Sequence, residues 1–480
     1  MADSPSSTVW WLEEALADGD GFSQALAGDL KVDVCIVGGG YTGLWTALEI
    51  AQHSPDTSVA VIEQHVCGMG ASGRNGGWVT GWHDELDGLI HHFGEAEGAR
   101  LAARSAWAIG RIRRFCEEHD IDCAFRQRGV LWVASAPSQL DAWEPAMRAC
   151  ARHGRADKLE LVDPDTLRAR VGSPVPIAGA RQTDAATVQP ALLVRGLRRV
   201  AIRLGVQVYE GTPMLSLDRG APATVRTPAG RVRADRVVLA TGAWASRLRE
   251  LRRSIVPVGT TIVATEPLGD RIRELPWAGG EGLGDARLMV HYSQVTPAGR
   301  LIFGRGGGAL GRAGRVTPKH FHDARSIRAV AADFRRWFPS LHDVALTHAW
   351  GGPVDRTPGH FPFTAVIGDH GSVICGLGYS GNGVGPSALL GRILGRHVLG
   401  IVDEDTTSAL TRGPIGLLPP DPLRSLAGVL VRAAVERCED REERGRRASV
   451  AMPLLRGLVR FKVPPRLDPR LRKQHGRSVA

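Results

Sequence analysis

The 480-residue chain is short of lysine, of paired cysteines and of long apolar runs. Its seven cysteines form an odd set without paired spacing, which favours reduced thiols and a cytoplasmic protein over a disulfide-bonded secreted one. The N-terminal twenty residues are acidic and have no apolar core, so we expect no signal peptide. The most apolar candidate, ALLGRILGRHVLGIV, is interrupted by arginines and does not predict a membrane span.

The net charge of +10 is unevenly distributed along the chain. Residues 406–480 contain 16 Arg/Lys against 7 Asp/Glu, a net +9, so the first 405 residues are nearly neutral. The segment has few aromatic residues, and we therefore expect no nucleic-acid partner. Leu423, Leu426, Leu430 and Ala434 repeat at helical spacing. We expect a mostly helical extension that packs on the body and turns a basic face outward, where it could lie against an anionic membrane surface.

A nucleotide-binding pattern begins at residue 32, in VDVCIVGGGYTGLWTALEI. An apolar run predicts a buried parallel strand, Gly38, Gly40 and Gly43 follow in G-x-G-x-x-G spacing, and a helical pattern comes next. A second strand, SVAVIE, ends at Glu63, 20 residues after Gly43. The glycines permit a tight turn and close approach of a pyrophosphate, the helix N-terminus attracts phosphate, and the acid accepts hydrogen bonds from a ribose. This pattern predicts an adenine-dinucleotide site.

Two further strand-to-loop segments decide between NAD and FAD. ADRVVLATGAWAS (234–246) ends in Thr241 and Gly242, and GSVICGLGYSGNGVGPSALLGRILG (371–395) leads into a second glycine-rich loop and a helix. A simple NAD domain completes its cofactor contacts within about 150 residues. Segments spread over residues 32–395 instead favour FAD, which lies extended through a flavoprotein.

These motifs, with the glycine-rich stretch CGMGASGRNGG (67–77), resemble the FAD-dependent D-amino-acid oxidase/glycine oxidase superfamily. GASGRNGG and GYSGNGVGPS are similar to its γ-glutamylputrescine oxidase and aminophosphonate oxidoreductase branches. The resemblance implies an α/β fold in which a Rossmann-like FAD-binding domain is interleaved with an α+β substrate domain around a mixed sheet. It places an N-terminal arm at 1–29, the FAD-binding domain at 30–110, 170–250 and 345–405, the substrate domain at 111–169 and 251–344, and the extension at 406–480.

The resemblance also implies a set of cofactor-binding residues in three motifs. They are Gly38, Gly40, Tyr41, Thr42, Gly43 and Glu63, then Gly70, Ala71, Ser72, Gly73, Arg74, Asn75, Gly76 and Gly77, then Thr241, Gly242, Gly378, Tyr379, Ser380, Gly381, Asn382, Gly383 and Val384. Arg74 would offset negative charge on the cofactor. Related proteins that bind FAD covalently use a cysteine in the segment equivalent to 350–362 or a histidine in the segment equivalent to GASGRNGG, and neither is present. We expect non-covalent FAD and no metal site.

The implied reaction is oxidation of a C–N bond, with hydride transfer to the flavin and hydrolysis of the resulting imine. We select His291, Tyr292, Arg305 and Asn382 as catalytic candidates, because an arginine could clamp a phosphonate or carboxylate and Asn382 stands beside a helix start. Tyr379 and His360 are further pocket candidates. Gly385 occupies the position where sarcosine-oxidase-like relatives keep a carboxylate-binding lysine, which disfavours a compact α-amino acid.

Several functions remain open at this point. The leading hypothesis is an amine oxidase that takes a primary or secondary amine, such as an aminophosphonate or a γ-glutamyl-polyamine-like amine, and uses O2 as acceptor. An amine dehydrogenase that passes electrons to a quinone or carrier protein is an alternative, as are a flavin-dependent monooxygenase-like enzyme and a flavin-binding protein without turnover.

Overall fold

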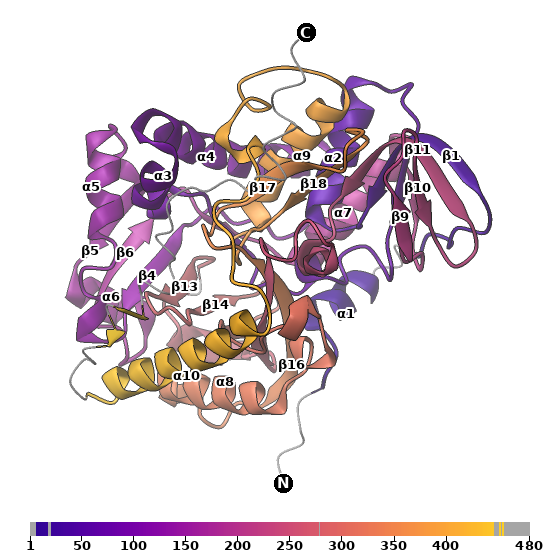
Figure 1. Ribbon diagram of the computed structural model, residues 1–480. Helices are drawn as coiled ribbons and strands as arrows, with labels where there is room; N and C mark the ends of the chain where they lie inside the picture. The colour runs from indigo at the N-terminus through magenta and orange to yellow at the C-terminus, as the bar shows by residue number, and fades with distance from the viewer. Residues whose placement is uncertain (1–5, 18–20, 278, 446–450, 453, 456–480) are drawn as a thin grey trace.

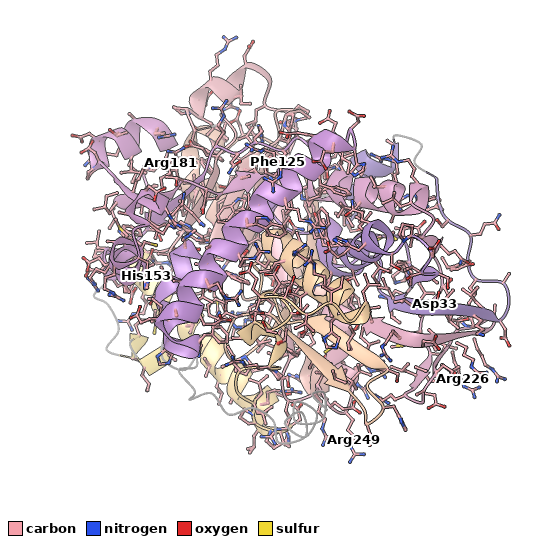
Figure 2. All side chains as sticks on the ribbon, turned by 90° about the horizontal axis from the view of Figure 1, so that it is seen from above. Asp33, Phe125, His153, Arg181, Arg226 and Arg249 are labelled. Carbon is pink, nitrogen blue, oxygen red and sulfur yellow. The ribbon has the colours of Figure 1, made fainter. Side chains whose placement is uncertain are left out.

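The computed structural model describes residues 6–17, 21–277, 279–445, 451–452 and 454–455. Two eight-stranded sheets dominate the described residues. They lie on opposite sides of the molecule (Figure 1), and the view from above agrees, because Asp33 of β1 and Arg226 of β10 lie far from Arg181 of β6 (Figure 2). The short strands β3 (Trp78–Val79) and β7 (Ala186–Thr187) pair with each other outside both sheets.

The first sheet has the parallel core that the nucleotide-binding pattern predicts. Its main path runs β17-β18-β11-β1-β2-β8, and β1 pairs in parallel with both β2 and β11. Side chains alternate between two apolar cores, Val34 and Ile36 on one face and Cys35 and Val37 on the other, as expected for a sheet covered on both faces. The strands are β1 (Leu30–Val37), β2 (Val59–Ile62), β8 (Gln207–Tyr209), β9 (Ser216–Asp218), β10 (Ala223–Arg226), β11 (Arg231–Leu239), β17 (Phe363–Ile367) and β18 (Val373–Leu377).

Helices pack on one face of this sheet and on one another. Helix α2 contacts both α9 and α7, and α4 contacts α9. The shared core draws on Leu44, Ile109, Leu197 and Leu390, one from each of these four helices. The helices of this part are α2 (Tyr41–His53), α4 (Glu95–Glu118), α7 (Pro190–Arg203) and α9 (Val384–Val398).

The second sheet is mixed, in the order β16-β12-β15-β14-β13-β4-β6-β5. All its neighbours pair antiparallel except β13 and β4. Helix α8 (Ala324–Trp337) packs on one face through Phe334 and Trp337. The strands are β4 (Val130–Ala134), β5 (Leu159–Val162), β6 (Ala178–Gln182), β12 (Val256–Thr265), β13 (Gly282–Asp285), β14 (His291–Val295), β15 (Leu301–Arg305) and β16 (Leu346–Arg356). The mixed α/β fold class is thereby confirmed.

Two strands differ from the expected organisation. Both β6 and β16 lie in stretches expected in the FAD-binding domain, yet their backbone pairs are in the second sheet. Tertiary pairing decides sheet membership here, and short strand-like runs do not specify their partners. The domain boundaries themselves stay a prediction.

The remaining helices lie at the periphery, and α10 (Leu423–Glu443) is the longest of them. A helix was predicted here from the spacing of its leucines, but these leucines do not form the face that packs on the body. Leu423, Leu426 and Leu430 are 63%, 62% and 71% exposed, whereas Val435, Glu439 and Glu442 are buried. No described helix has both the length and the apolar character needed to cross a bilayer. The others are α1 (Trp10–Ala17), α3 (Leu86–Phe93), α5 (Glu144–Arg152) and α6 (Pro164–Val171).

Candidate functional site

A cavity of about 480 Å³ opens at the carboxyl ends of β1, β2 and β11, the position where ligands bind in open α/β sheets. Residues from all three predicted motifs meet there, although more than 300 positions separate the first from the last. Of the predicted cofactor residues, the cavity is lined by Gly38, Gly40, Tyr41, Thr42, Glu63, Gly70, Ala71, Ser72, Thr241, Gly242 and Tyr379.

The turn between β1 and α2 needs its glycines. Gly38 has φ +113°, and a Cβ there would lie 2.4 Å from the Ala240 carbonyl oxygen. A Cβ at Gly43 would lie 2.0 Å from the Gly38 carbonyl oxygen, so this glycine permits close contact between helix and strand. Gly40 precedes α2 and has no side chain that could cap the helix, although the Ser72 hydroxyl accepts from the Tyr41 amide. The helix dipole at this N-terminus favours an anion such as a phosphate.

Glu63 lies at the end of β2 on the cavity wall, as predicted for a ribose contact. Its Oε2 accepts from the Gly39 amide at 2.8 Å, and its Oε1 accepts from the His65 amide at 3.0 Å. Burial raises the pKa of Glu63, although both amides oppose this shift. Each carboxylate oxygen keeps a further lone pair for a ligand hydroxyl.

The first half of the glycine-rich loop at 70–77 lines the cavity, and the second half packs on β14. Gly70, Ala71 and Ser72 line the cavity, and the Ser72 hydroxyl accepts from the Tyr41 amide at 3.0 Å. The second half of the loop instead packs on β14. A Cβ at Gly76 would lie 2.5 Å from the Tyr292 ring, and one at Gly77 would lie 2.1 Å from the Gln294 amide nitrogen. These two glycines therefore allow loop-to-sheet contact.

Arg74 does not line the cavity, and it makes no ion pair with the described residues. Its Nε donates to the Met69 carbonyl at 2.7 Å and its Nη1 to the Gly351 carbonyl at 3.1 Å, while the guanidinium lies 5.0 Å from the centre of the Phe321 ring. Burial lowers its pKa to about 10. Arg74 is thus a half-buried cation whose charge no described carboxylate neutralises. Its main contacts are to backbone carbonyls.

The second glycine-rich loop, 378–384, contributes Tyr379 to the cavity wall. The Tyr379 hydroxyl lies 2.6 Å from the Thr42 hydroxyl. The predicted catalytic residue Asn382 is bound to the protein on both sides of its amide: it accepts from the Thr80 hydroxyl at 2.9 Å and donates to the Gly81 carbonyl at 3.2 Å. These bonds hold the loop against the residues that directly follow β3. The other members of this motif and His360 do not line the cavity.

Asp355 is a cavity residue that the sequence analysis missed. It lies near the end of β16, is 7% exposed, and accepts from the Gly378 amide through Oδ2 at 2.6 Å. No described cation forms an ion pair with it, and burial raises its pKa to about 6. The single acid at the end of the strand-like run WGGPVD was the available signal.

His291 and Tyr292 are adjacent on β14 and therefore point to opposite faces of the second sheet. Tyr292 faces the loop at 70–77. His291 faces α8 instead, with Nδ1 2.7 Å from Asp285 Oδ2 and Nε2 3.0 Å from Asp333 Oδ2. Arg305, paired with His291 across β14 and β15, donates to the same Asp333 oxygen at 2.9 Å. This placement argues against a direct catalytic part for His291 and Arg305.

The neighbouring carboxylates favour the protonated form of His291 in that cluster. Burial alone would lower the pKa of His291, but Asp285 and Asp333 more than offset it, and the pKa lies above its ordinary value. The imidazole can then donate to both carboxylates. Asp285, His291 and Glu443 place metal-type ligand atoms within 4.8 Å of one another. Arg287 lies beside them and forms an ion pair with Glu443 at 2.9 Å, so a cation already balances these acids.

Comparison with known proteins gives the same assignment as the cavity. The family model "FAD dependent oxidoreductase" (DAO) matches residues 33–396. The chain belongs to this family of FAD-dependent oxidoreductases. It is 32% identical to "Probable oxidoreductase OrdL" of Rhizobium meliloti (strain 1021) over 81% of this chain and 88% of that protein. It is 31% identical to "Gamma-glutamylputrescine oxidoreductase" of Escherichia coli (strain K12) over 77% of this chain and 84% of that protein.

Solved structures show the same fold. Glycine oxidase from Geobacillus kaustophilus superposes with a TM-score of 0.64 at 20% identity, over 81% of this chain and 100% of that one. The FAD cofactor of the family fits the residues present: a glycine turn with no room for a Cβ, the start of α2 and an acid at the end of β2 all line one cavity. The part that each individual residue plays in binding remains a prediction.

Proposed function

We propose that this FAD-dependent oxidoreductase oxidises the C–N bond of a primary or secondary amine, such as an aminophosphonate or a γ-glutamyl-polyamine-like amine. In the overall reaction, amine, water and O2 give a carbonyl compound, the released amine or ammonia, and hydrogen peroxide. The similarity to a γ-glutamylputrescine oxidoreductase over 77% of this chain supports an amine as the substrate class. A cytoplasmic location and non-covalent FAD are parts of the same proposal.

The observation that bears most on the substrate is the packing of Gly385. A Cβ at this position would lie 2.4 Å from the Thr80 carbonyl oxygen, so the chain has no room here for any larger side chain. A lysine that binds a substrate carboxylate cannot occupy this position without moving the backbone. A substrate whose anion lies next to its nitrogen would therefore lack this anchor, which favours an amine with its anion farther away or with none.

The residues of the cavity divide the work between cofactor and substrate. The Gly38–Gly40 turn and the start of α2 would hold the pyrophosphate, and Glu63 would accept from the ribose. Bound FAD supplies a two-electron acceptor for the substrate hydride. Helix α9 starts after Gly383 without a side-chain cap, and its dipole favours negative charge at this end. Asp355 gives the cavity an acid without a cationic partner among the described residues, suited to face a donor or a cation.

The test is anaerobic reduction of the FAD-loaded protein by a panel of amines. The panel contains 2-aminoethylphosphonate, its N-methyl form, γ-glutamylputrescine, glycine and sarcosine, and 2-hydroxyethylphosphonate serves as the matched control without nitrogen. We expect one non-α amine to bleach the visible flavin band while the hydroxy control leaves it unchanged.

Admitting air then separates the two amine-oxidising alternatives. Rapid recovery of the flavin band, with about one peroxide per amine consumed, would support an oxidase. Slow recovery without peroxide, together with fast turnover of a quinone analogue, would identify a dehydrogenase. Reduction by NADPH without any amine would contradict the proposal and favour a monooxygenase-like enzyme.

A further inference from the structure

Helix α10 docks with its acidic face inward, against arginines of the second sheet and α8. Glu439 accepts from the Leu288 amide at 2.6 Å and from Arg287 Nε at 3.1 Å. Glu443 forms ion pairs with Arg287 at 2.9 Å and with Arg336 at 2.6 Å. Figure 1 shows α10 as the long yellow helix on the outside of this sheet, beside α8. Glu439 and Glu443 of α10 are therefore neutralised by contacts within the protein.

The opposite face of α10 has a different composition. Six residues spaced three, four or seven apart share one side of the helix, and we name them the outer stripe: Leu423, Leu426, Leu430, Arg437, Arg441 and Arg444. All six are exposed, and the three arginines form no ion pair with described residues. The outer stripe thus places leucines on the first half of the helix and uncompensated positive charge on the second.

The sequence after α10 continues this charge. Residues 446–480 contain ten Arg/Lys and one acidic residue, a net +9, whereas residues 406–445 contain six of each sign. The described chain reaches the helix again at Met452 and Leu455, which pack with Val435 and Met289. The basic segment therefore starts next to α10. The family model ends at residue 396, so the helix and this segment both lie outside the residues that it matches.

We propose that α10 is an interfacial helix that docks this protein onto an anionic lipid surface, with the leucines of the outer stripe entering the headgroup region. An exposed leucine row with arginines on the same face is typical of helices that lie in a membrane surface. A segment with net charge +9 adds attraction to anionic headgroups. The same charge opposes two other occupants, the basic segment itself and a second copy, since each would bring positive charge to Arg437, Arg441 and Arg444.

Flotation of the full-length, FAD-loaded protein with vesicles tests the proposal. One vesicle set contains phosphatidylglycerol and phosphatidylcholine in a ratio of about 3:7, and the other contains phosphatidylcholine alone. We expect binding to the anionic set at low salt, at least about tenfold weaker binding to the neutral set, and loss of binding at high salt.

Two double variants test whether vesicle binding depends on the leucines of the outer stripe or on exposed leucines in general. Leu426→Glu/Leu430→Glu should weaken vesicle binding by about tenfold or more while the melting temperature stays unchanged, because both side chains point away from the protein. Leu161→Glu/Leu204→Glu is the matched control, since these leucines are 66% and 38% exposed, on β5 and just after α7. The control should bind vesicles like the unaltered protein.

Three results would overturn the proposal. No flotation with anionic vesicles would remove the lipid partner. Equal flotation of Leu426→Glu/Leu430→Glu and its control would show that the helix face is not the contact. A Leu426→Glu/Leu430→Glu variant that turns a dimer into a monomer in vesicle-free sedimentation would identify a second copy as the occupant of the outer stripe.

Discussion

His291 and Tyr292 are neighbours on β14, but the two faces of their sheet have different surroundings. On the face of Tyr292, glycines and aromatic rings meet the loop that leads to the FAD cavity. On the face of His291, buried acids, arginines and the imidazole form a closed charge cluster that holds α8 and α10. One face thus packs on the loop that reaches the cavity, and the other face attaches helices.

The largest expected effect comes from opening the charge cluster at Arg287. Its guanidinium is fully buried and forms ion pairs with Glu439, Asp440 and Glu443. Arg287→Met should lower the free energy of unfolding by about 3–5 kcal/mol, because it leaves buried carboxylates without a cation. Urea denaturation measures this loss. FAD affinity of the folded variant should not change, and a stable variant that has lost FAD would contradict the separation of the two faces.

Asp355 should have a smaller effect, and one that depends on pH. Its pKa in the folded apoprotein is raised by burial to about 6, so ionisation costs stability as pH rises from the ordinary value near 3.8 towards 6. This shift corresponds to a cost on the order of 3 kcal/mol above pH 6. Apo Asp355→Asn should therefore be more stable than the unaltered apoprotein at pH 8 and equal to it near pH 4. Parallel pH profiles of the two proteins would contradict the uncompensated carboxylate.

His291 should lose its contribution to stability as pH rises, the same direction as Asp355 but for a different reason. Because its pKa is raised by Asp285 and Asp333 in the folded state, its contribution is complete below about pH 6.5 and is lost as pH rises through the folded-state pKa. Thermal unfolding at pH 6 and pH 9 should show this loss in the unaltered protein and not in His291→Asn. A pH-dependent rate of flavin reduction that disappears in His291→Asn, without any change in stability, would restore a catalytic part for this residue.

The smallest expected effect is that of Asn382→Ala. The side chain holds the 378–384 loop to Thr80 and Gly81 through one accepted and one donated bond, so its removal should cost about 1–2 kcal/mol of stability. Denaturation of the apoprotein checks this. A variant with unaltered stability and a strongly slowed flavin reduction would instead support the predicted catalytic role.

Local sequence patterns predicted the parts of the fold that depend on local geometry. The Gly38 turn, the acid at the end of β2 and the strands that supply Thr241 and Tyr379 follow from backbone space and from short periodicity. Which face of β14 meets the 70–77 loop does not follow, because alternation predicts two faces without saying which of them packs on the loop. The same limit applies to α10: leucine spacing predicts the helix, but ion pairs with other elements turn its acids inward and leave the leucines exposed. Asp355 was missed because only tertiary pairing of β16 brings it to the cavity.

The most direct test of the FAD cavity is a titration of the apoprotein with FAD, followed by flavin fluorescence, for two glycine variants. Gly40→Leu would place a side chain in the cavity, and even its Cβ would lie only 2.8 Å from the Ser72 hydroxyl oxygen. Gly28→Leu is the matched control, since a Cβ there meets nothing within 4 Å. We predict that Gly40→Leu weakens FAD binding about a hundredfold or more while Gly28→Leu binds normally. Equal FAD affinity in the two folded variants would contradict the location of the cofactor site.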